Sequence, residues 1–593
     1  MFSKMLTGAL GAGIFALGAA TSAQAANIAV NDAGNSGPGT LRAAINTANN
    51  TPLVEDTIKF AIPGNGVHTI TPLTPLPTIT APVKINGYTQ TDADPATDAS
   101  PATLRIVIDA GNVDDGLVIE ADGVTVKGLD IQGALREGVH IEGSNNTIAG
   151  NYIGTGVNGD AARPNDLEGV RVLRGDGNLI GGPDAADRNV ISSNGFAEIL
   201  VDEGAGNTVQ NNHIGTDVDG TTDLADGRGV QIQASGNVVR DNLVSGESTG
   251  IEVDGDDNVV QGNRVGTDAD GSAALPNVTG VEVFGDGNQI GGMADGEGNL
   301  VSGNEKSGVE LRPSGVDPAE RSKIEGNLIG TTAAGDAPLP NGDAGVTVSG
   351  SGNNTIGGTA AGAGNVIAGN AGAGVELENA DGNTVFGNWI GTDATGVLDL
   401  GNGGSGVEID GDTNQIGDTG SAAANTIAHN GADGVTVDSG TGNAVLRNSI
   451  DDNNGLAIDL ADDGPTSNDA DDLDPGANDL QNGPEIQSAE VNSVEWSLDS
   501  EATTKYRVEF YTNDTCSGAS VTEAQTFLGS TTVTTDANGH KDDSTPITLP
   551  AGAGPYVSMT ATRLQRVLTG LFPPTFTLVP RSTSEVSPCE EIS

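Results

Sequence analysis

A short repeat in the middle of the chain constrains its fold more than any other feature. Each copy opens with a glycine followed by an aliphatic residue. The clear copies begin at Gly138, Gly169, Gly229, Gly250, Gly280, Gly308, Gly345, Gly374, Gly406, Gly434 and Gly455, and Phe196-Ala197 is interpreted as a degenerate copy. The closest copies lie 21 residues apart, and loops stretch the others to about 30, a repeat length that is typical of solenoids.

Two further motifs follow the opening glycine within a copy. The first is Asn-x-aliphatic-x-x-Asn, as from Asn146 to Asn151. The second is Ile-Gly-Thr, as at Ile153, and it is interpreted as the start of a third strand; other copies carry Ile-Gly-Gly, as at Ile180. Each copy therefore predicts one coil of three short strands with period-two alternation, separated by glycine or asparagine corners.

The physical chemistry of these residue types supports a stack of such coils. Valines and isoleucines that alternate along a strand are expected to point inward and to pack on the next coil. Glycine and asparagine tolerate the left-handed backbone that tight corners demand. Corner asparagines in register are expected to hydrogen-bond as a ladder. The fixed internal order does not fit a Greek-key sandwich, and the helix signals of a leucine-rich repeat are absent.

The motifs Gly-Val-x-Ile, Asn-Thr-Ile-x-Gly-Asn and Ile-Gly-Thr-Asp resemble the right-handed parallel β-helix repeats of the pectate-lyase-like superfamily. The resemblance is greatest to secreted bacterial surface proteins of that class and covers roughly residues 27–482. It implies an all-β fold, a right-handed parallel β-helix solenoid. It implies little about activity, because one fold carries many functions.

The composition agrees with a solenoid and limits the partners. The chain has 593 residues, 89 of them glycine, and only 3% are aromatic. That is too long for one ordinary core and too poor in large apolar residues for several, whereas a coil needs only a few inward aliphatics. The formal net charge of −56 opposes binding to nucleic acid or anionic lipid, so neither is an expected partner.

The first 25 residues are typical of a cleavable export signal. Lys4 supplies a positive start, an apolar stretch runs from Leu6 to Ala20, and Ala23-Gln24-Ala25 fits a small-x-small cleavage site. No later stretch of 18 apolar residues is present, so no membrane-crossing helix is expected. The chain is therefore predicted to be exported to the periplasm, the cell surface or the medium.

Changes in pattern divide the chain into five predicted parts. These are a signal peptide (1–25), an N-terminal cap with the first strands (26–101), the β-helix (102–461), an acidic linker (462–483) and a small C-terminal β-sandwich (484–593). The cap is needed because an open terminal coil would expose strand edges and apolar core. Thr40 is expected to N-cap a short helix. The apolar face of this helix is Leu41, Ala44, Ile45 and Ala48.

Two features of the C-terminal part stand out. Cys516 and Cys589 are the only cysteines, and in an exported chain they are expected to form a disulfide. The segment from Arg563 to Arg581 holds three arginines and no acid, which makes it foreign to the acidic chain around it. An inserted loop or a docking segment would each account for it.

The acidic linker offers a candidate calcium site. Asp469, Asp471, Asp474 and Asn478 supply closely spaced oxygen ligands of the kind that calcium prefers, although the spacing does not match an EF-hand. The alternative is that this stretch is only a solvated linker. There is no Cys/His metal set, no nucleophile elbow and no phosphate-binding loop in the chain.

Aligning the copies reveals a second candidate site. The residue after each Gly-aliphatic pair is expected to point outward, and it reads His140, Arg171, Glu198, Gln231, Glu252, Glu282, Glu310, Thr347, Glu376, Glu408 and Thr436. Carboxylates are densest at Glu376, Glu378, Glu408 and Asp410. Neighbouring strands lie about 4.8 Å apart, so these charges repel unless salt, bound cations, raised pKa values or a cationic partner offset them.

Two classes of function fit these features. A glycan-binding or adhesive surface scaffold, with calcium on the acidic face, is favoured by the regular repeats and by the lack of a recognisable catalytic set. The alternative is a polysaccharide-degrading enzyme that uses Glu376, Glu378, Glu408 and Asp410, since a glycoside hydrolase needs two carboxylates at a suitable spacing. A lyase fits less well, because it needs arginine or lysine beside calcium and the arginines gather at Arg163, Arg171, Arg174 and Arg188.

Overall fold

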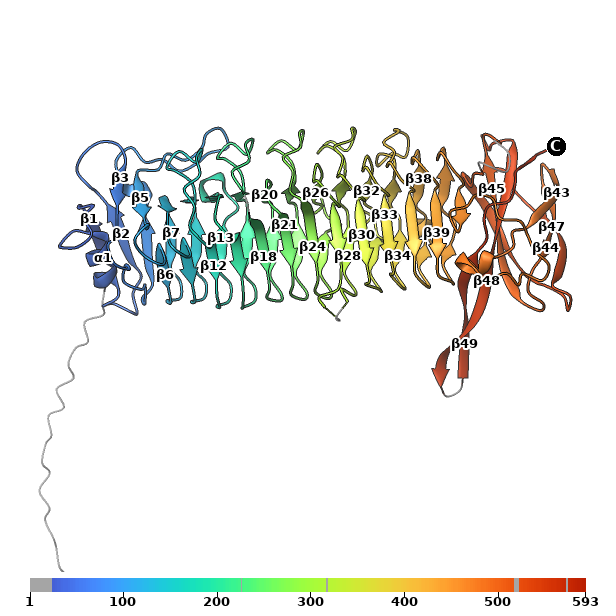
Figure 1. Cartoon of the computed structure of the whole chain (residues 1–593), viewed down its shortest axis with the longest axis horizontal. Coiled ribbons are helices and arrows are strands. Elements are labelled where there is room, and N and C mark those ends of the chain that lie inside the picture. Colours follow the sequence, from blue (N-terminus) through green and yellow to red (C-terminus); the bar gives the residue numbers. More distant parts are fainter. Residues whose placement is uncertain (1–23, 226, 316–317, 517–521, 572–573) are drawn as a thin grey trace, which may run out of the picture.

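The computed structural model describes residues 24–225, 227–315, 318–516, 522–571 and 574–593. Nearly all of the predicted signal peptide, residues 1–23, lies outside this range. The described chain is a long parallel β-helix that ends in a small antiparallel domain (Figure 1). This confirms the predicted fold class.

Three parallel sheets run the length of the β-helix, and each coil passes through them in the order C, A, B. Sheet A consists of β1 (Asn27–Val30), β2 (Asp56–Phe60), β4 (Val83–Asn86), β7 (Thr125–Lys127), β10 (Thr147–Ala149), β13 (Leu179–Gly181), β16 (Thr208–Gln210), β19 (Val238–Arg240), β22 (Val259–Gln261), β25 (Gln289–Gly291), β28 (Lys323–Glu325), β31 (Thr355–Gly357), β34 (Thr384–Phe386), β37 (Gln415–Ile416) and β40 (Ala444–Val445). Sheet B consists of β3 (His68–Ile70), β5 (Ile106–Asp109), β8 (Leu129–Gln132), β11 (Tyr152–Ile153), β14 (Val190–Ile191), β17 (His213–Ile214), β20 (Leu243–Val244), β23 (Arg264–Val265), β26 (Leu300–Val301), β29 (Leu328–Ile329), β32 (Val366–Ile367), β35 (Trp389–Ile390), β38 (Thr426–Ala428) and β41 (Ser449–Asp451). Sheet C consists of β6 (Leu117–Ile119), β9 (Val139–Ile141), β12 (Glu168–Val172), β15 (Ala197–Val201), β18 (Arg228–Ile232), β21 (Thr249–Val253), β24 (Thr279–Val283), β27 (Val309–Leu311), β30 (Val346–Ser349), β33 (Val375–Glu378), β36 (Val407–Asp410), β39 (Val435–Ser439) and β42 (Ile458–Leu460).

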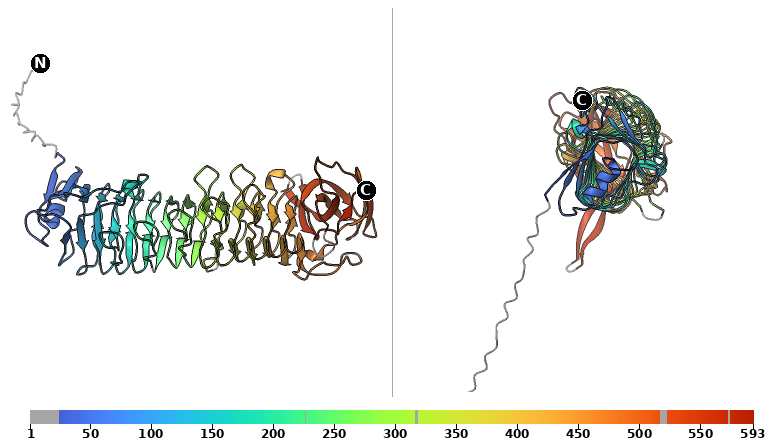
Figure 2. Two further views of the ribbon diagram at one scale, coloured as in Figure 1. Left: turned by 90° about the horizontal axis from the view of Figure 1, so that it is seen from above. Right: turned by 90° about the vertical axis from the view of Figure 1, so that its left-hand side faces the viewer.

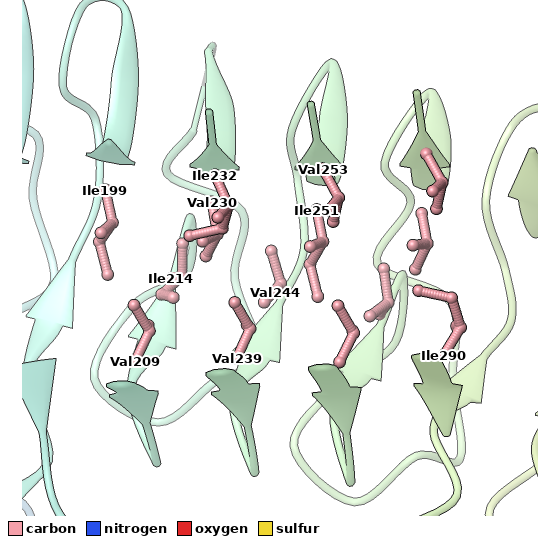
Figure 3. Close-up of a cluster of buried hydrophobic side chains, with 14 of the residues drawn as sticks. Ile199, Val209, Ile214, Val230, Ile232, Val239, Val244, Ile251, Val253 and Ile290 are labelled. Atoms are coloured by element: carbon pink, nitrogen blue, oxygen red, sulfur yellow. The ribbon is translucent and has the colours of Figure 1, made fainter. Parts of the chain in front are cut away.

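The core is built from the alternating aliphatic residues of all three sheets. Val230 and Ile232 of sheet C, Val239 of sheet A and Val244 of sheet B meet in the centre of one coil, and each is at most 1% exposed. The same positions in the next coil lie directly beside them, so the residues form continuous stacks along the axis (Figure 3). Stacking of this kind buries apolar surface in every coil without any large side chain.

Buried asparagines at the corners form the predicted ladders. In each ladder the backbone N–H of one residue, and often its side-chain amide, donates to the side-chain oxygen of the residue one coil further on. The C–A corner ladder is Asn146, Asn178, Asn207, Asn237, Asn258, Asn288, Ser322, Asn354, Asn383, Asn414, Asn443 and Asn478. The A–B corner ladder is Asn151, Asn189, Asn212, Asn242, Asn263, Asn299, Asn327, Asn365, Asn388, Asn425 and Asn448. The B–C corner ladder includes Asn165, Asn194, Asn277, Asn304, Asn341, Asn370, Asn402, Asn430 and Asn453.

Loops occupy the corner after sheet B in every second coil. The interpretation of Ile-Gly-Thr as the start of a strand was wrong, because Ile153 ends β11 and Gly154, at φ +84°, opens the loop. The Ile-Gly-Gly motif belongs to sheet A, where Ile180 lies in β13. Each loop is closed by one antiparallel bridge, between the pairs Thr155–Ala162, Thr216–Asp223, Thr267–Ala274, Thr331–Pro338 and Thr392–Asp399.

The first four of these loops also bond to one another across the intervening coil. The N–H of Val218 donates to the carbonyl of Gly159 at 2.9 Å, that of Ala269 to Gly220 at 2.9 Å, and that of Ala333 to Gly271 at 2.9 Å. These four loops therefore form a stacked wall along one side of the β-helix.

Both ends of the β-helix are covered. At the N-terminal end, Thr40 caps α1 (Leu41–Ala48), whose predicted apolar face is buried. At the other end, the segment 462–483 is no free linker, because Ala477 is in the core and Asn478 extends the C–A ladder. Short 3-10 helices are η1 (Gly87–Thr89), η2 (Ala185–Asp187), η3 (Ser421–Ala423) and η4 (Ala477–Leu480).

The C-terminal domain consists of two antiparallel sheets packed face to face. One sheet holds β43 (Glu485–Glu490), β44 (Ser493–Asp499) and β47 (His540–Pro546), and the other holds β45 (Lys505–Asn513), β46 (Thr526–Thr534), β48 (Tyr556–Leu571), β49 (Pro574–Thr583) and β50 (Glu590–Glu591). Trp496 of the first sheet contacts Phe510 of the second edge to face, with ring centroids 6.3 Å apart. Cys516 and Cys589 form a disulfide that ties β50 to the loop after β45.

The ladders predict how stability responds to loss of one asparagine. Asn388 donates to the carbonyl of Ile356 at 2.9 Å and accepts from the backbone and side chain of Asn365. Asn388→Ala leaves several buried polar groups unpaired, and each such group costs about 1–3 kcal/mol. We expect a clearly lower urea midpoint and faster hydrogen exchange in the coils around β34. The control Asn454→Ala changes an exposed corner asparagine and should leave both nearly unchanged; equal effects would contradict a stabilising role for the ladders.

Candidate functional site

The four candidate carboxylates lie together on the outer face of sheet C. Glu376 is the register partner of Glu408, and Glu378 is that of Asp410, on the adjacent strands β33 and β36. Backbone pairing at about 4.8 Å sets the separation of their Cα atoms. We call the outward carboxylates of sheet C the acidic face: Glu252, Glu282, Glu310, Glu376, Glu378, Glu408 and Asp410.

Arginines neutralise the earlier coils of the acidic face. Arg228 Nε lies 2.5 Å from Glu252 Oε2, and Arg312 bonds to Glu282 while its Nη1 lies 3.6 Å from Glu310. Each guanidinium also lies over a phenylalanine ring: Arg312 is 5.1 Å from the centroid of Phe284. The sequence alignment did not pair these arginines with the carboxylates, because Arg228 precedes the glycine of its copy and Arg312 reaches back across one strand.

A groove of about 520 Å³ runs over this part of sheet C. Its walls combine carboxylates, cations, hydroxyls and little apolar surface. The lining residues are Arg228, Ser248, Thr249, Glu252, Val278, Thr279, Glu282, Lys306, Ser307, Glu310, Arg312, Asp343, Thr347, Glu376 and Glu378.

The later coils carry the same carboxylates without cations. Glu376 accepts from Thr347 Oγ1 at 3.3 Å, and Glu378 accepts from Ser349 Oγ at 3.0 Å. Within the described ranges no arginine or lysine forms an ion pair with either residue, nor with Glu408 or Asp410. Burial, with the negative charge of Asp438 beside it, raises the pKa of Glu408 to about 7, and burial also raises the pKa of Glu376.

The acidic face continues into a cluster of three aspartates. Carboxylate oxygens of Asp433, Asp459 and Asp462 lie within 4.8 Å of one another at the C-terminal end of sheet C. Asp459 is the register partner of Thr436, so it belongs to the same column as Glu408. Burial raises the pKa of both Asp433 and Asp459. Three carboxylates this close are a candidate cation site.

The residues that the structure brings together in the predicted calcium loop differ from the predicted set. Asp469, Asp472 and Asp474 bring carboxylate oxygens within 4.8 Å of one another, whereas Asp471 lies outside this group and is exposed. Asn478 takes part in the C–A ladder. Its side chain is buried and donates at 2.8 Å to the carbonyl of Asn443, whose N–H it accepts.

Glu198 does not point outward as the alignment required. It occupies the register of Gly169 and Gly229, so the degenerate copy begins at Glu198 rather than Phe196. The carboxyl is fully buried and accepts from the N–H of Asn194 at 3.0 Å, in the place of a ladder asparagine. Burial raises its pKa to about 8, so the group is uncharged near neutral pH.

An ionic cluster near the start of sheet C was also missed. His140 lies between Glu137, 3.8 Å from its Nδ1, and Glu142, 3.4 Å from its Nε2, and these carboxylates raise its pKa. Arg171 Nη1 contacts Glu137 at 3.1 Å and also pairs with Asp202. The spacing Glu137-x-x-His140 is visible in the sequence, but nothing there shows that the strands bring Arg171 beside it.

The predicted arginine cluster is therefore divided between two faces. Arg171 and Arg174 hold carboxylates on sheet C, whereas Arg188 lines a second cavity, of about 310 Å³, over sheet B. His213 and Arg264 line the same cavity. Within the described chain no helix has the length and apolar character needed to span a membrane.

Comparison with known proteins identifies the repeat. The family model of the right-handed β-helix region matches residues 110–329 and 228–416. No curated protein matches the chain.

Solved structures with a similar backbone fold have little sequence identity to this chain. The Dettilon tailspike protein is 15% identical, with 90% of this chain and 76% of that chain covered, at a TM-score of 0.34. The tailspike protein of E. coli bacteriophage HK620, solved in complex with a pentasaccharide, is 12% identical, with 86% and 88% covered, at a TM-score of 0.30. The A-module of a mannuronan C-5 epimerase from Azotobacter vinelandii is 14% identical, with 71% and 96% covered, at a TM-score of 0.27. Such likenesses carry no inference about activity.

The raised pKa of Glu408 predicts a pH dependence of stability. Because the pKa is about 7 in the folded chain against 4.5 for an unperturbed glutamate, the folded state holds this proton more tightly than the unfolded state. The stabilisation is fully present below pH 4.5 and is lost as the pH rises through 7. We therefore expect the urea midpoint of Glu408→Gln to fall less than that of wild type as the pH rises through this window. Above the window the midpoint of Glu408→Gln should exceed that of wild type.

The matched control is Glu305→Gln, which removes an exposed carboxylate at the corner before β27, outside the strands of sheet C. It should follow the wild-type curve. A Glu408→Gln curve that stays parallel to wild type would show that this carboxyl does not titrate in the window.

Proposed function

The chain belongs to the family of right-handed β-helix proteins, and on that premise we propose that it is a glycan-binding surface scaffold. The proposal rests chiefly on the groove over sheet C, which is lined by carboxylates, hydroxyl groups, two arginines and one lysine. Each of the two arginines also lies over a phenylalanine ring beside the groove. An extended polysaccharide lies along this groove, across the strands. Its hydroxyl groups donate to the carboxylates and accept from the guanidinium groups.

The arginines of the groove are held in place before any ligand arrives. Arg312 lies between Glu282, Glu310 and the ring of Phe284, and Arg228 lies between Glu252 and the ring of Phe196. Side chains fixed by several contacts lose little conformational entropy on binding, which favours a weak ligand such as a sugar. The strand repeat of sheet C presents similar groups at regular intervals, as binding to a repeating polymer requires.

Divalent cations, and calcium in particular, complete the acidic end of the face in this proposal. Glu376, Glu378, Glu408 and Asp410 have no cationic partner among the described residues, and hard oxygen ligands suit calcium. The clusters Asp433–Asp459–Asp462 and Asp469–Asp472–Asp474 offer further positions. A bound cation offsets the repulsion between the stacked carboxylates and bridges them to an acidic glycan or a neighbouring surface.

Export to an oxidising compartment fits this role. The segment of residues 1–25 has the pattern of a cleavable signal, and the disulfide between Cys516 and Cys589 is of a kind that persists outside the cytoplasm. The partner is then a polysaccharide or a cell-surface glycan, met in the periplasm, at the cell surface or in the medium.

A glycoside hydrolase is the second candidate. One observation favours it: Glu376 and Glu408 are adjacent in register, and the raised pKa of Glu408 suits a proton donor. Retaining hydrolases place their two carboxyl groups about 5–5.5 Å apart, which neighbouring strands permit. Arg228 and Arg312 are each bound to carboxylates, so neither is placed as a lyase would use it.

The groove predicts a specific loss of glycan binding. Arg312→Gln removes one of the cations of the groove and uncovers Phe284, and a hydrogen bond to a charged group is typically worth about 1.5–3 kcal/mol. We expect affinity for the best ligand of a polysaccharide panel to fall tenfold or more by calorimetry. The control Arg240→Gln removes an exposed arginine of β19 in sheet A, which does not line this groove, and should bind as wild type does.

The same panel distinguishes binding from hydrolysis. Release of reducing ends by wild type, abolished in both Glu376→Gln and Glu408→Gln, would establish the hydrolase. If no polysaccharide binds, or if Arg312→Gln binds unchanged, the glycan-binding proposal is wrong.

Calcium should stabilise the folded chain through the acidic face. We expect calcium to raise the melting temperature by mass action, and sodium at equal ionic strength to do much less, because it screens without bridging. The double variant Glu376→Gln/Glu408→Gln should be more stable than wild type without calcium and should gain less from it. Differential scanning calorimetry measures both effects.

A second double variant separates the two candidate positions. Asp469→Asn/Asp472→Asn removes the carboxylates of the loop and leaves the acidic face intact. If it loses the response to calcium while Glu376→Gln/Glu408→Gln keeps it, the loop is the binding site and the acidic face is only solvated.

A further inference from the structure

The cavity of about 310 Å³ over sheet B, here called the sheet B cavity, has a floor that spans five consecutive coils. In the view along the axis the coils superimpose, so the outward side chains of one sheet lie in line from coil to coil (Figure 2). The line over the floor consists of Tyr152, Val190, His213, Leu243 and Arg264. Strand pairing therefore sets the positions from which an aromatic ring, an imidazole and a guanidinium group project along one face of sheet B.

A hairpin from the N-terminal part of the chain forms one wall of the cavity. Residues 94–103 fold back on themselves, and Asp94 and Thr103 exchange backbone hydrogen bonds at 3.0 and 2.8 Å. The hydroxyl of Tyr152 donates to the carbonyl of Ala102 at 3.0 Å, which holds the hairpin over sheet B. The stacked loops contribute further lining residues: Val218, Asp219 and Ala269. The cavity is therefore enclosed by segments that lie far apart in the sequence and are fixed by hydrogen bonds.

The cations of the cavity are not matched by carboxylates. Within the described residues neither Arg188 nor Arg264 forms an ion pair. Arg188 Nη2 donates to the side-chain oxygen of Asn211 at 3.3 Å, but its Nε is buried and has no hydrogen-bond partner there. A buried N–H without an acceptor costs free energy, and the acceptors that suit a guanidinium group best are the oxygens of an acid group. Arg188 therefore favours a ligand that carries such a group.

His213 lies one coil beyond Arg188 on the floor. It is 8% exposed, and its Nδ1 has no hydrogen-bond partner among the described residues. Burial, together with the positive charge of Arg188, lowers the pKa of His213 to about 4, so the ring is neutral near neutral pH. An anion beside both side chains would offset these effects and favour the protonated ring, which donates from both nitrogens. The two side chains together are thus suited to an acid group.

Three carboxylates also line the cavity, but they do not cancel the charge of Arg188. Asp98, Asp219 and Asp241 are all exposed, and none lies within ion-pairing distance of a guanidinium group of the cavity. Water solvates exposed carboxylates and salt screens their field, whereas Arg188 is partly buried and burial lowers its pKa. A charge withdrawn from water acts more strongly on a neighbouring ligand than an exposed one does. The cavity is therefore expected to prefer anions.

The rest of the lining limits the size and character of the ligand. Val190, Leu243 and Pro101 supply apolar surface, and Thr97 and Ser100 supply hydroxyl groups. The volume lies at the lower end of the range of about 300–1,000 Å³ that is usual for small-molecule sites. A ligand of this site is therefore small, and it joins an acid group to a body with an apolar face.

We propose that the sheet B cavity binds a small organic anion, a carboxylate carried on a single ring. The carboxylate lies between Arg188 and His213, and the ring lies against Val190 and Leu243. Arg264, three strands beyond Val190 and about 14 Å further along the axis, reaches back to a polar group at the far end of the ligand. A free acid and the acidic end of a saccharide chain share this chemistry. The site goes beyond glycan binding over sheet C and does not depend on it.

Isothermal titration calorimetry of the full chain tests the site. The probes are glucuronate, galacturonate and cyclohexanecarboxylate, with EDTA present so that no calcium bridges them to the acidic face. We expect at least one of these ring acids to bind with a Kd of about 1 mM or below, and glucose, a neutral counterpart, not to bind in this range. Arg188→Gln should weaken binding about tenfold or more, because a hydrogen bond to a charged group is lost, and Arg264→Gln should weaken it less.

The ring of His213 reports binding in the wild-type chain, so the test holds even if Arg188→Gln fails to fold. The chain has five histidines, and His213→Gln identifies the signal of this ring in a proton–carbon NMR spectrum. On saturation with the ring acid, the pKa of His213 should rise from about 4 to about 5 or above, because a neighbouring anion stabilises the protonated ring.

Two controls separate this site from the rest of the molecule. Arg163→Gln removes an exposed arginine that does not line the cavity, and Arg312→Gln removes one from the groove over sheet C. Both should bind the ring acid as wild type does. Arg188→Gln in turn should keep wild-type affinity for the polysaccharide, so the failure of one site leaves the other proposal standing.

An oligosaccharide that ends in the best ring acid distinguishes the two sources. If it binds about tenfold more tightly than the free acid, the ligand is a chain end, and equal or weaker binding assigns the site to a free acid. The proposal is wrong if no ring acid binds at about 10 mM, or if glucose or inorganic sulfate binds as tightly as the best ring acid. It is also wrong if a ring acid binds and leaves the pKa of His213 unchanged.

Discussion

At each corner of a coil the backbone turns inward and leaves amide groups that no sheet hydrogen bond can reach. A buried asparagine satisfies them, because its side chain carries both a donor and an acceptor. Asn388, for example, bonds to Asn365 in the coil before it and to Asn425 in the coil after it. The ladder thus continues from coil to coil, and it fixes the positions of the strands between the corners. The thin aliphatic core suffices because the backbone N–H groups at the corners are bonded from coil to coil.

The ladders also explain how so acidic a chain remains folded. The carboxylates of the acidic face lie outside the bonded frame, so their mutual repulsion acts on side chains rather than on the backbone. At Glu408, burial and the neighbouring charge of Asp438 raise the pKa, and the pairing of β36 with β39 shifts register just beyond it, between Ile409 and Asp410. At Glu198 a charged carboxylate would be buried within the ladder. Its raised pKa keeps the carboxyl uncharged near neutral pH, and the group takes the place of a ladder asparagine. The asparagine ladders therefore hold the backbone independently of the charges on the acidic face.

The periodic part of this molecule could be predicted from the sequence, and the exceptions could not. The inward valines, the corner asparagines and the register of Glu376 with Glu408 follow from a repeat whose period is set by the strands. The position of Glu198 did not follow, because one irregular copy shifts the alignment by two residues. The ion pairs of Arg228 and Arg312 depend on long side chains that cross between strands. The role of Asn478 lies beyond the last glycine copy, where the pattern no longer indicates which residue continues the ladder.

The wall of loops beside sheet B has a consequence for how the molecule opens. In a simple solenoid each coil contacts only the coils directly before and after it. Here the loop of one coil is bonded to the loop two coils away, as Val218 is to Gly159 and Ala269 to Gly220. Between the first and the fourth loop, a coil therefore cannot open alone without breaking a bond that belongs to a more distant coil. In this middle part of the β-helix the smallest unit of local unfolding is expected to be larger than one coil.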